Sequence, residues 1–162
     1  MSRFDLHWKL IARTGATTPD TLQTLATIEP EPFDVVVTSL GVNDVTSGRS
    51  PRRWMIDQAR LVALLRKEFG AQRILLSALP PMHLFPALPQ PLRAYLGAQA
   101  QRYNAALREW AQDTAGCTWV SLDLAMDRSH MAHDGFHPGP PVYAAWAQRL
   151  ARQIEADAVA PQ

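Results

Sequence analysis

The segment Phe33–Leu40, which contains three consecutive valines, constrains the fold more than any other part of the chain. An apolar, β-branched run of this length indicates a strand that is buried on both faces, as strands in parallel sheets usually are. Parallel strands need long crossover connections, which helices normally supply. The chain is therefore expected to alternate strands with helices around a parallel sheet.

The rest of the chain repeats this pairing of an apolar run with a helical segment. Thr18-Pro19-Asp20 predicts a helix start, with the threonine as N-cap and the proline at the first helical position. Ser50-Pro51 predicts a second start, and Gly70 is expected to end that helix. The predicted strands are 7–12, 33–40, 73–79 and 118–122, and the predicted helices are 18–28, 51–69, 92–115 and 141–154.

Four strand–helix pairs favour a three-layer α/β/α fold, with helices on both faces of the sheet. The chain has 162 residues, 47% of them apolar, which is enough for one substantial core. We expect a single domain over residues 1–158 and a frayed tail over residues 159–162.

Charge and cysteine content exclude several classes of function. The net charge is only +1 and no basic stripe stands out, so nothing favours a nucleic-acid partner. No apolar run approaches the roughly 20 residues of a membrane span. Cys117 is the only cysteine, so no internal disulfide can form. This suits a reducing compartment and predicts a cytoplasmic location.

The turn Asp134-Gly135-Phe136-His137-Pro138 is the strongest candidate for chemistry. Glycine lets the backbone turn sharply, so the Asp134 carboxylate can reach the Nδ1–H of His137. That contact would set the tautomer of the imidazole and leave Nε2 available as a general base. In parallel sheets such groups gather beyond the carboxyl ends of the strands.

Two further loops are expected at the same edge of the sheet, and both suit acyl transfer. Asn43, in Gly41-Val42-Asn43-Asp44, offers a side-chain NH₂ just after the buried strand. Gly15 offers an unobstructed backbone N–H between a predicted strand and a predicted helix. Such donors would stabilise the oxyanion of a tetrahedral intermediate. Either residue also has a structural interpretation, Asn43 as an Asx-type loop bond and Gly15 as a turn.

These motifs resemble those of the SGNH (GDSL-type) hydrolases. Gly41–Asp44 resembles their GxND motif, Asp134–Pro138 their DxxHP motif, and Gly15 their lone oxyanion glycine, in the same order along the chain. The resemblance implies a flavodoxin-like α/β/α fold that hydrolyses small-molecule esters through an acyl-enzyme and needs no cofactor. It also implies that His137 is the base, that Asp134 orients it, and that Gly15 and Asn43 are the oxyanion donors.

The nucleophile is the departure from this family, because the chain contains no Gly-Asp-Ser motif. The chain resembles a member that lacks its N-terminal portion, including a strand that would lie between 7–12 and 33–40. No other serine is a convincing substitute: Ser39 is expected to point into a packed face, and Ser50 to cap a helix. Ser2, Ser47 and Ser129 are not convincing nucleophiles either. We therefore expect the acid, base and oxyanion groups to be present with little or no turnover.

The proline-rich segment Pro80–Pro91 has two interpretations. It can be a simple connector, or its apolar residues can border the acyl-binding cleft. Those residues are Met82, Leu84, Phe85 and Leu88.

Two other functions stay open. The chain could be a non-catalytic remnant or interaction module, because an unpaired sheet edge favours homo-oligomers. It could also be a metal-dependent hydrolase that uses His130, His133 and His137, although Gly135 and Pro138 interrupt any helix that would cluster them.

Overall fold

A three-stranded parallel sheet lies at the centre of the computed structural model, which describes residues 6–122 and 129–159. The strands lie in the order β1-β2-β3, and both neighbouring pairs are parallel. They are β1 (Val35–Thr38), β2 (Arg73–Ser77) and β3 (Cys117–Val120). Three of the four predicted strands are thus confirmed, each shorter than expected.

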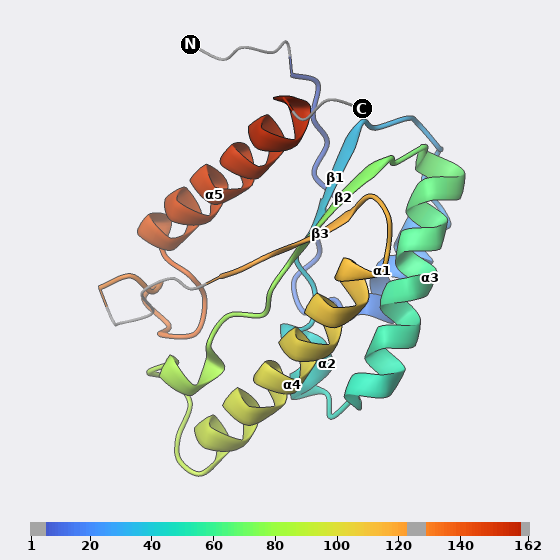
Figure 1. The fold of residues 1–162 in the computed structure, drawn as a ribbon. Coiled ribbons are helices and arrows are strands. Elements are labelled where there is room, and N and C mark those ends of the chain that lie inside the picture. The colour runs from blue at the N-terminus through green and yellow to red at the C-terminus, as the bar shows by residue number, and fades with distance from the viewer. Residues whose placement is uncertain (1–5, 123–128, 160–162) are drawn as a thin grey trace.

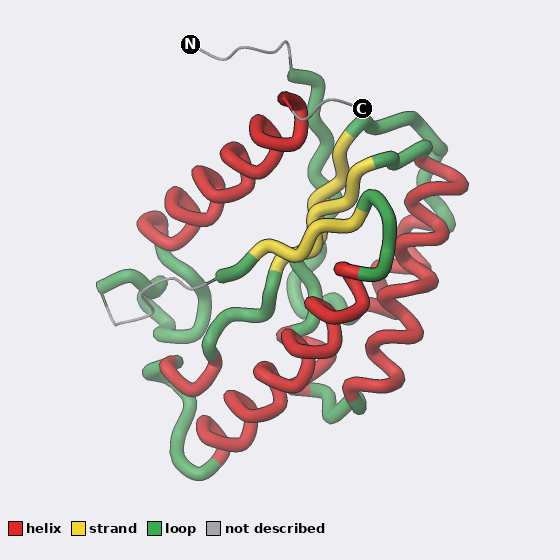
Figure 2. The backbone as a smooth tube through the Cα atoms, in the orientation of Figure 1, coloured by secondary structure: helices red, strands yellow, loops and turns green. Residues whose placement is uncertain are grey.

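Helices cover both faces of this sheet, which confirms the predicted three-layer α/β/α fold. Figure 1 shows α5 on one face, with α3 and α4 on the other. Figure 2 shows the strands as a thin central layer between the helices. The helices are α1 (Thr18–Leu25), α2 (Val42–Thr46), α3 (Pro51–Phe69), α4 (Leu92–Gln112) and α5 (Pro140–Val159).

The strand predicted at 7–12 is wrong. This segment has no regular structure, and its large apolar side chains face solvent, with Trp8 76% exposed. High strand propensity produces a strand only where a neighbour supplies ladder hydrogen bonds. Among the described residues nothing pairs with this segment, and β1 forms the edge of the sheet.

The edge position of β1 also corrects the prediction that its valines are buried on both faces. Val36 packs against the core, whereas Val37 is 38% exposed. A strand with one neighbour and one open edge cannot bury both faces as an interior strand does.

Several helix boundaries differ from the prediction for local reasons. Thr17, not Thr18, is the N-cap of α1, and it forms a capping box with Asp20. The start of α3 is confirmed, because the Ser50 side chain accepts the N–H of Arg53 at 3.3 Å. Gly70 ends that helix in the left-handed conformation, as predicted.

The remaining differences concern the ends of later elements. The helix α4 ends at Gln112 rather than at 115, and α5 begins at Pro140. The short helix α2 and one 3₁₀ turn, η1 (Met82–Leu84), were not predicted. The expected frayed tail at 159–162 falls outside the described residues except for Val159, which belongs to α5.

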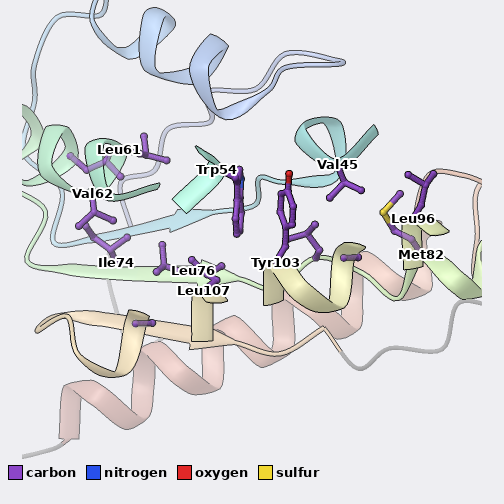
Figure 3. Close-up of a cluster of buried hydrophobic side chains, with 14 of the residues drawn as sticks. Val45, Trp54, Leu61, Val62, Ile74, Leu76, Met82, Leu96, Tyr103 and Leu107 are labelled. Atoms are coloured by element: carbon purple, nitrogen blue, oxygen red, sulfur yellow. The ribbon is translucent and has the colours of Figure 1, made fainter. Parts of the chain in front are cut away.

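The main core lies between the sheet and the α3–α4 layer (Figure 3). Trp54 of α3 stacks on Tyr103 of α4 with ring centroids 4.5 Å apart, and neither side chain is exposed. Burying such large aromatic groups contributes strongly to stability. The layer therefore gives the loops at the carboxyl ends of the strands a rigid base.

Candidate active site

The Asp134–His137 turn has the geometry of an oriented base. His137 Nδ1 lies 2.5 Å from Asp134 Oδ2. Asp134 Oδ1 accepts the backbone N–H groups of Phe136 and His137, both at 2.9 Å. Since an ionised carboxylate only accepts, Nδ1 carries the hydrogen and Nε2 is free to take a proton.

The same contacts lower the pKa of Asp134 well below its usual range. The hydrogen bond from the His137 side chain is the largest cause, followed by the two backbone N–H groups. The Asp134 side chain is half exposed, so water screens part of this effect. The carboxylate is therefore ionised at any pH at which a histidine base would work.

One backbone hydrogen bond and one aromatic contact connect this turn to the proline-rich segment. Ala87 N–H donates to the carbonyl of Gly135 at 3.2 Å. Phe136 meets Phe85 edge-to-face, with ring centroids 5.4 Å apart. Such edge-to-face pairs stabilise beyond simple burial. The proline-rich segment thus packs against the turn that carries His137 instead of only joining two elements.

The structure brings Gly15 and Asn43 together. Asn43 Nδ2 donates to the carbonyl of Ala16, next to Gly15, at 2.9 Å. An amide NH₂ has two hydrogens, so one is free for another acceptor. Gly15 has φ +75, and a Cβ there would meet nothing within 4 Å, so its surroundings are open.

Gly41, which precedes α2, allows the chain to lie close to Leu79. Its φ is +130, and a Cβ at this position would lie 2.7 Å from Leu79 Cδ1. Only glycine fits such a backbone conformation at such a distance. The glycine of the GxND-like motif is therefore required for packing the loop that carries Asn43.

A single cleft of about 380 Å³ joins the predicted base and both predicted donors. His137, Gly15 and Asn43 all line it, although they come from three separate parts of the chain. Its apolar lining includes Phe85, Phe136, Val142, Tyr143 and Trp146. A small number of polar groups in an apolar cleft is typical of a small-molecule site.

Ser39 corrects one expectation. It is exposed and lines this cleft, whereas the sequence predicted that it points into a packed face. The cause is again the open edge of β1, because Ser39 follows directly after that strand. No hydrogen bond joins Ser39 to His137 in the described part of the chain.

The other serines lie elsewhere. Ser50 caps α3 as predicted, and Ser47 Oγ donates to the Asp44 carbonyl at 2.9 Å. Ser129 Oγ contacts the Nδ1 of its neighbour His130 at 3.3 Å. Ser2 lies outside the described residues.

The four residues expected along the cleft separate in the structure. Phe85 lines it, and Met82 is fully buried in the core. Leu84 is 47% exposed, and Leu88 packs partly buried against the core. Tyr143 and Trp146 line the cleft instead. The sequence predicted only that both lie on the apolar face of a helix. The local sequence does not show which end of that face lies against a site.

A metal-binding arrangement is not found within residues 6–122 and 129–159. No group of three or more His, Cys, Asp or Glu side chains there is placed to hold an ion. The three histidines of the sequence-based alternative thus do not form a cluster. Among the described helices none is long and apolar enough to cross a bilayer.

Comparisons with known proteins agree with this fold. A family model described as "GDSL-like Lipase/Acylhydrolase family" matches residues 2–145. No curated protein matches the sequence.

Several solved structures share the fold at low sequence identity. A candidate platelet activating factor from Streptococcus pneumonia has 18% identity and a TM-score of 0.72, over 86% of this chain and 68% of that one. A carbohydrate esterase of family 3 from Talaromyces cellulolyticus has 18% identity and a TM-score of 0.63, over 89% and 69%. AlinE4, an SGNH-hydrolase family esterase, has 20% identity and a TM-score of 0.53, over 91% and 74%.

Proposed function

Because the chain belongs to the GDSL-like lipase/acylhydrolase family, we propose that its cleft is an ester-hydrolysing site with His137 as the general base. The observation that carries the proposal is that one cleft is lined by His137, Gly15 and Asn43 together. These are a base and two kinds of N–H donor, which acyl transfer needs around one carbonyl group.

In the proposed reaction His137 Nε2 removes the proton from a serine hydroxyl, whose oxygen attacks the ester carbonyl carbon. The negative oxygen of the tetrahedral intermediate accepts hydrogen bonds from the Gly15 N–H and the free Nδ2 hydrogen of Asn43. His137 then passes its proton to the departing alkoxide. Water hydrolyses the acyl-enzyme with the same base, which regenerates the serine.

Asp134 has a supporting role in this scheme. It keeps the hydrogen on Nδ1 and stabilises the imidazolium that forms when Nε2 is protonated. Its lowered pKa supports the role, since the acid stays ionised while the histidine cycles. The apolar side chains at Phe85, Phe136 and Tyr143 would contact the acyl group.

The serine is the group that this chain does not place against its base. Ser39 lines the cleft, but the described residues give His137 no serine hydrogen-bond partner. A nucleophile and its base normally lie within hydrogen-bond reach, at about 2.6–3.2 Å. We therefore propose that Ser39 is not the nucleophile and that this chain alone hydrolyses esters only slowly.

The test is hydrolysis of p-nitrophenyl acetate by the purified chain. Since no serine lies against the base, we expect only a slow rate, in which His137 Nε2 activates water directly, and this rate should fall to the buffer rate in His137→Ala. Two matched controls, His83→Ala outside this cleft and Ser39→Ala within it, should keep the slow rate. An unchanged rate in His137→Ala would contradict the esterase proposal as a whole.

A separate outcome tests the slow turnover. Enzyme-like rates, with fluorophosphonate labelling of Ser39 and loss of both in Ser39→Ala, would make Ser39 the nucleophile. That result would overturn the second part of the proposal and leave the role of His137 intact.

The edge of the sheet supports a second candidate function, self-association. The β1 edge carries no backbone pairing among the described residues, and Val37 is exposed on it. Leu6, Trp8 and Leu10 are also exposed. An open edge is a template for pairing with a second chain, and exposed apolar groups favour such association.

A further inference from the structure

We propose that Asp44 is a positioning residue that keeps the Gly15 turn against Asn43, and this inference rests on the proposed function of that site. Asp44 is fully buried and lies next to Asn43 at the start of α2. The reaction scheme does not use it. A buried carboxylate is costly unless its partners compensate it, so its contacts deserve an explanation.

Within the described part of the chain, every hydrogen bond to this carboxylate comes from one residue, Thr18. The Thr18 N–H is shared between Asp44 Oδ1 at 3.2 Å and Oδ2 at 3.1 Å. The Thr18 hydroxyl donates to Oδ2 at 3.0 Å. Asp44 therefore binds both the backbone N–H and the side-chain hydroxyl of Thr18.

The direction of these hydrogen bonds is set by two neighbours of Thr18. Trp54 Nε1 donates to Thr18 Oγ1 at 3.1 Å, and Gln58 Nε2 donates to the same oxygen at 3.0 Å. An indole N–H can only donate, so the hydroxyl oxygen accepts and its single hydrogen is left for Asp44. The N–H and the hydroxyl hydrogen of Thr18 thus both point toward the carboxylate, and only an acceptor fits there.

The position of Thr18 relates these hydrogen bonds to the candidate active site. Thr18 is the first residue of α1, whose N-terminal N–H groups lack partners within the helix. A negative charge is stabilising at this end of a helix. Two residues before Thr18, the Ala16 carbonyl accepts from Asn43. The consecutive residues Asn43 and Asp44 thus connect to both sides of one short turn, and Gly15 precedes it directly.

The consequence is geometric. The Gly15 N–H and the Asn43 amide must converge on one oxyanion, although Gly15 lies in the turn before α1 and Asn43 lies in α2. Small misplacements of such donors are costly, because about 1 Å can reduce a rate by about 10²-fold. The hydrogen bonds that Thr18 donates to Asp44 and that Asn43 donates to Ala16 set the position of this turn relative to α2.

Substitutions at both ends of the contact test the inference. Asp44→Asn places an NH₂ group where only acceptors fit, and Thr18→Val removes the hydroxyl at constant shape. Thr18→Ser keeps the hydroxyl. Asp57→Asn is the matched control, because it removes another buried carboxylate, one paired with Arg49. All four variants are compared in the purified full chain.

The first readout needs no activity. In ¹⁵N NMR spectra, we expect Asp44→Asn and Thr18→Val to shift the Gly15 amide and the Asn43 side-chain signals and to speed hydrogen exchange at Thr18. Thr18→Ser and Asp57→Asn should leave all three unchanged. Unchanged signals in Asp44→Asn, or equal shifts in Asp57→Asn, would overturn the positioning role whether or not the chain hydrolyses esters.

The second readout is the His137-dependent hydrolysis of p-nitrophenyl acetate. We expect a loss of about 10–100-fold in kcat with little change in KM for Asp44→Asn and Thr18→Val, with Thr18→Ser restoring the rate. A similar loss in Asp57→Asn would indicate general destabilisation and contradict the inference. Failure of the proposed function is distinguishable, because it would abolish the dependence on His137 in the unmodified chain.

Discussion

Asn43 donates a 2.9 Å hydrogen bond to the carbonyl of Ala16, although the two residues are 27 positions apart in the sequence. This contact joins α2, which follows β1, to the turn before α1. The lone glycine and the GxND-like tetrapeptide are weak motifs in the sequence. In the structure their N–H donors lie close together. His137 reaches the same cleft from near the other end of the chain.

Replacing Asp134 by asparagine should change the tautomer of His137. The amide can present its NH₂ to Nδ1, which would then accept and leave the hydrogen on Nε2. We expect the ¹⁵N NMR shifts of the His137 ring to exchange their pattern, while those of His83 stay the same. The His137-dependent ester hydrolysis should fall by at least about 10²-fold. An Nδ1–H tautomer retained in the variant would contradict this interpretation of the turn.

The stability contribution of Asp134 should depend on pH with a definite sign. Its pKa is lower in the folded chain than its ordinary value of 3.8, mainly through the His137 hydrogen bond. Such a group stabilises the fold above its unfolded pKa and loses that contribution as pH falls through the folded pKa. The difference in Tm between the wild-type chain and Asp134→Asn should therefore be greatest near neutral pH and shrink below about pH 4. A difference that grows toward low pH would contradict the prediction.

Gly41→Ala should destabilise the chain more than Gly48→Ala. Both glycines have positive φ, so both substitutions impose backbone strain. Only at Gly41 would the new Cβ also collide with Leu79, at 2.7 Å, whereas nothing lies within 4 Å at Gly48. We expect Gly41→Ala to lose about 1–3 kcal/mol more in the free energy of unfolding, measured by urea denaturation. Equal losses would show that the loop can move away from Leu79.

Tyr143→Ala should weaken the binding of longer acyl groups. Tyr143 is 50% exposed and lines the cleft, whereas Leu84 is 47% exposed and does not. Leu84→Ala is therefore a control of matched exposure. Acetate and octanoate are tested as inhibitors of His137-dependent hydrolysis. Octanoate should inhibit more strongly than acetate in the wild-type chain, and this difference should disappear only in Tyr143→Ala. The same loss in Leu84→Ala would place the acyl group elsewhere.

The open edge of β1 predicts self-association that a charge can block. Val37→Lys places a solvated cation beside the unpaired strand edge, a device that natural proteins use against edge pairing. Ile56→Lys, on α3 and 48% exposed in the wild type, is the control. Light scattering should show concentration-dependent oligomers in the wild-type chain and in Ile56→Lys, but monomers in Val37→Lys. A monomeric wild-type chain would exclude the edge as an interface.

Features that depend on neighbouring residues could be predicted from the sequence. Asp134 and His137 are three positions apart, so one turn around Gly135 brings their side chains together with little help from the rest of the fold. Ser50 and Gly70 bound α3 for the same local reason. The strand–helix alternation predicted the parallel sheet, because parallel strands require crossovers and helices are the usual ones.

Features that depend on distant partners could be seen only in the folded chain. The segment 7–12 has strand propensity but no ladder partner among the described residues, so it forms no strand. Ser39 lines the cleft because β1 is an edge strand, a fact of sheet order that local sequence does not encode. Thr18 was predicted as a helix cap, yet its side chain is part of a buried network with Asp44, 26 residues away. Long-range packing brings the groups of this network together, because contacts between residues distant in the sequence form only when the whole layer has assembled.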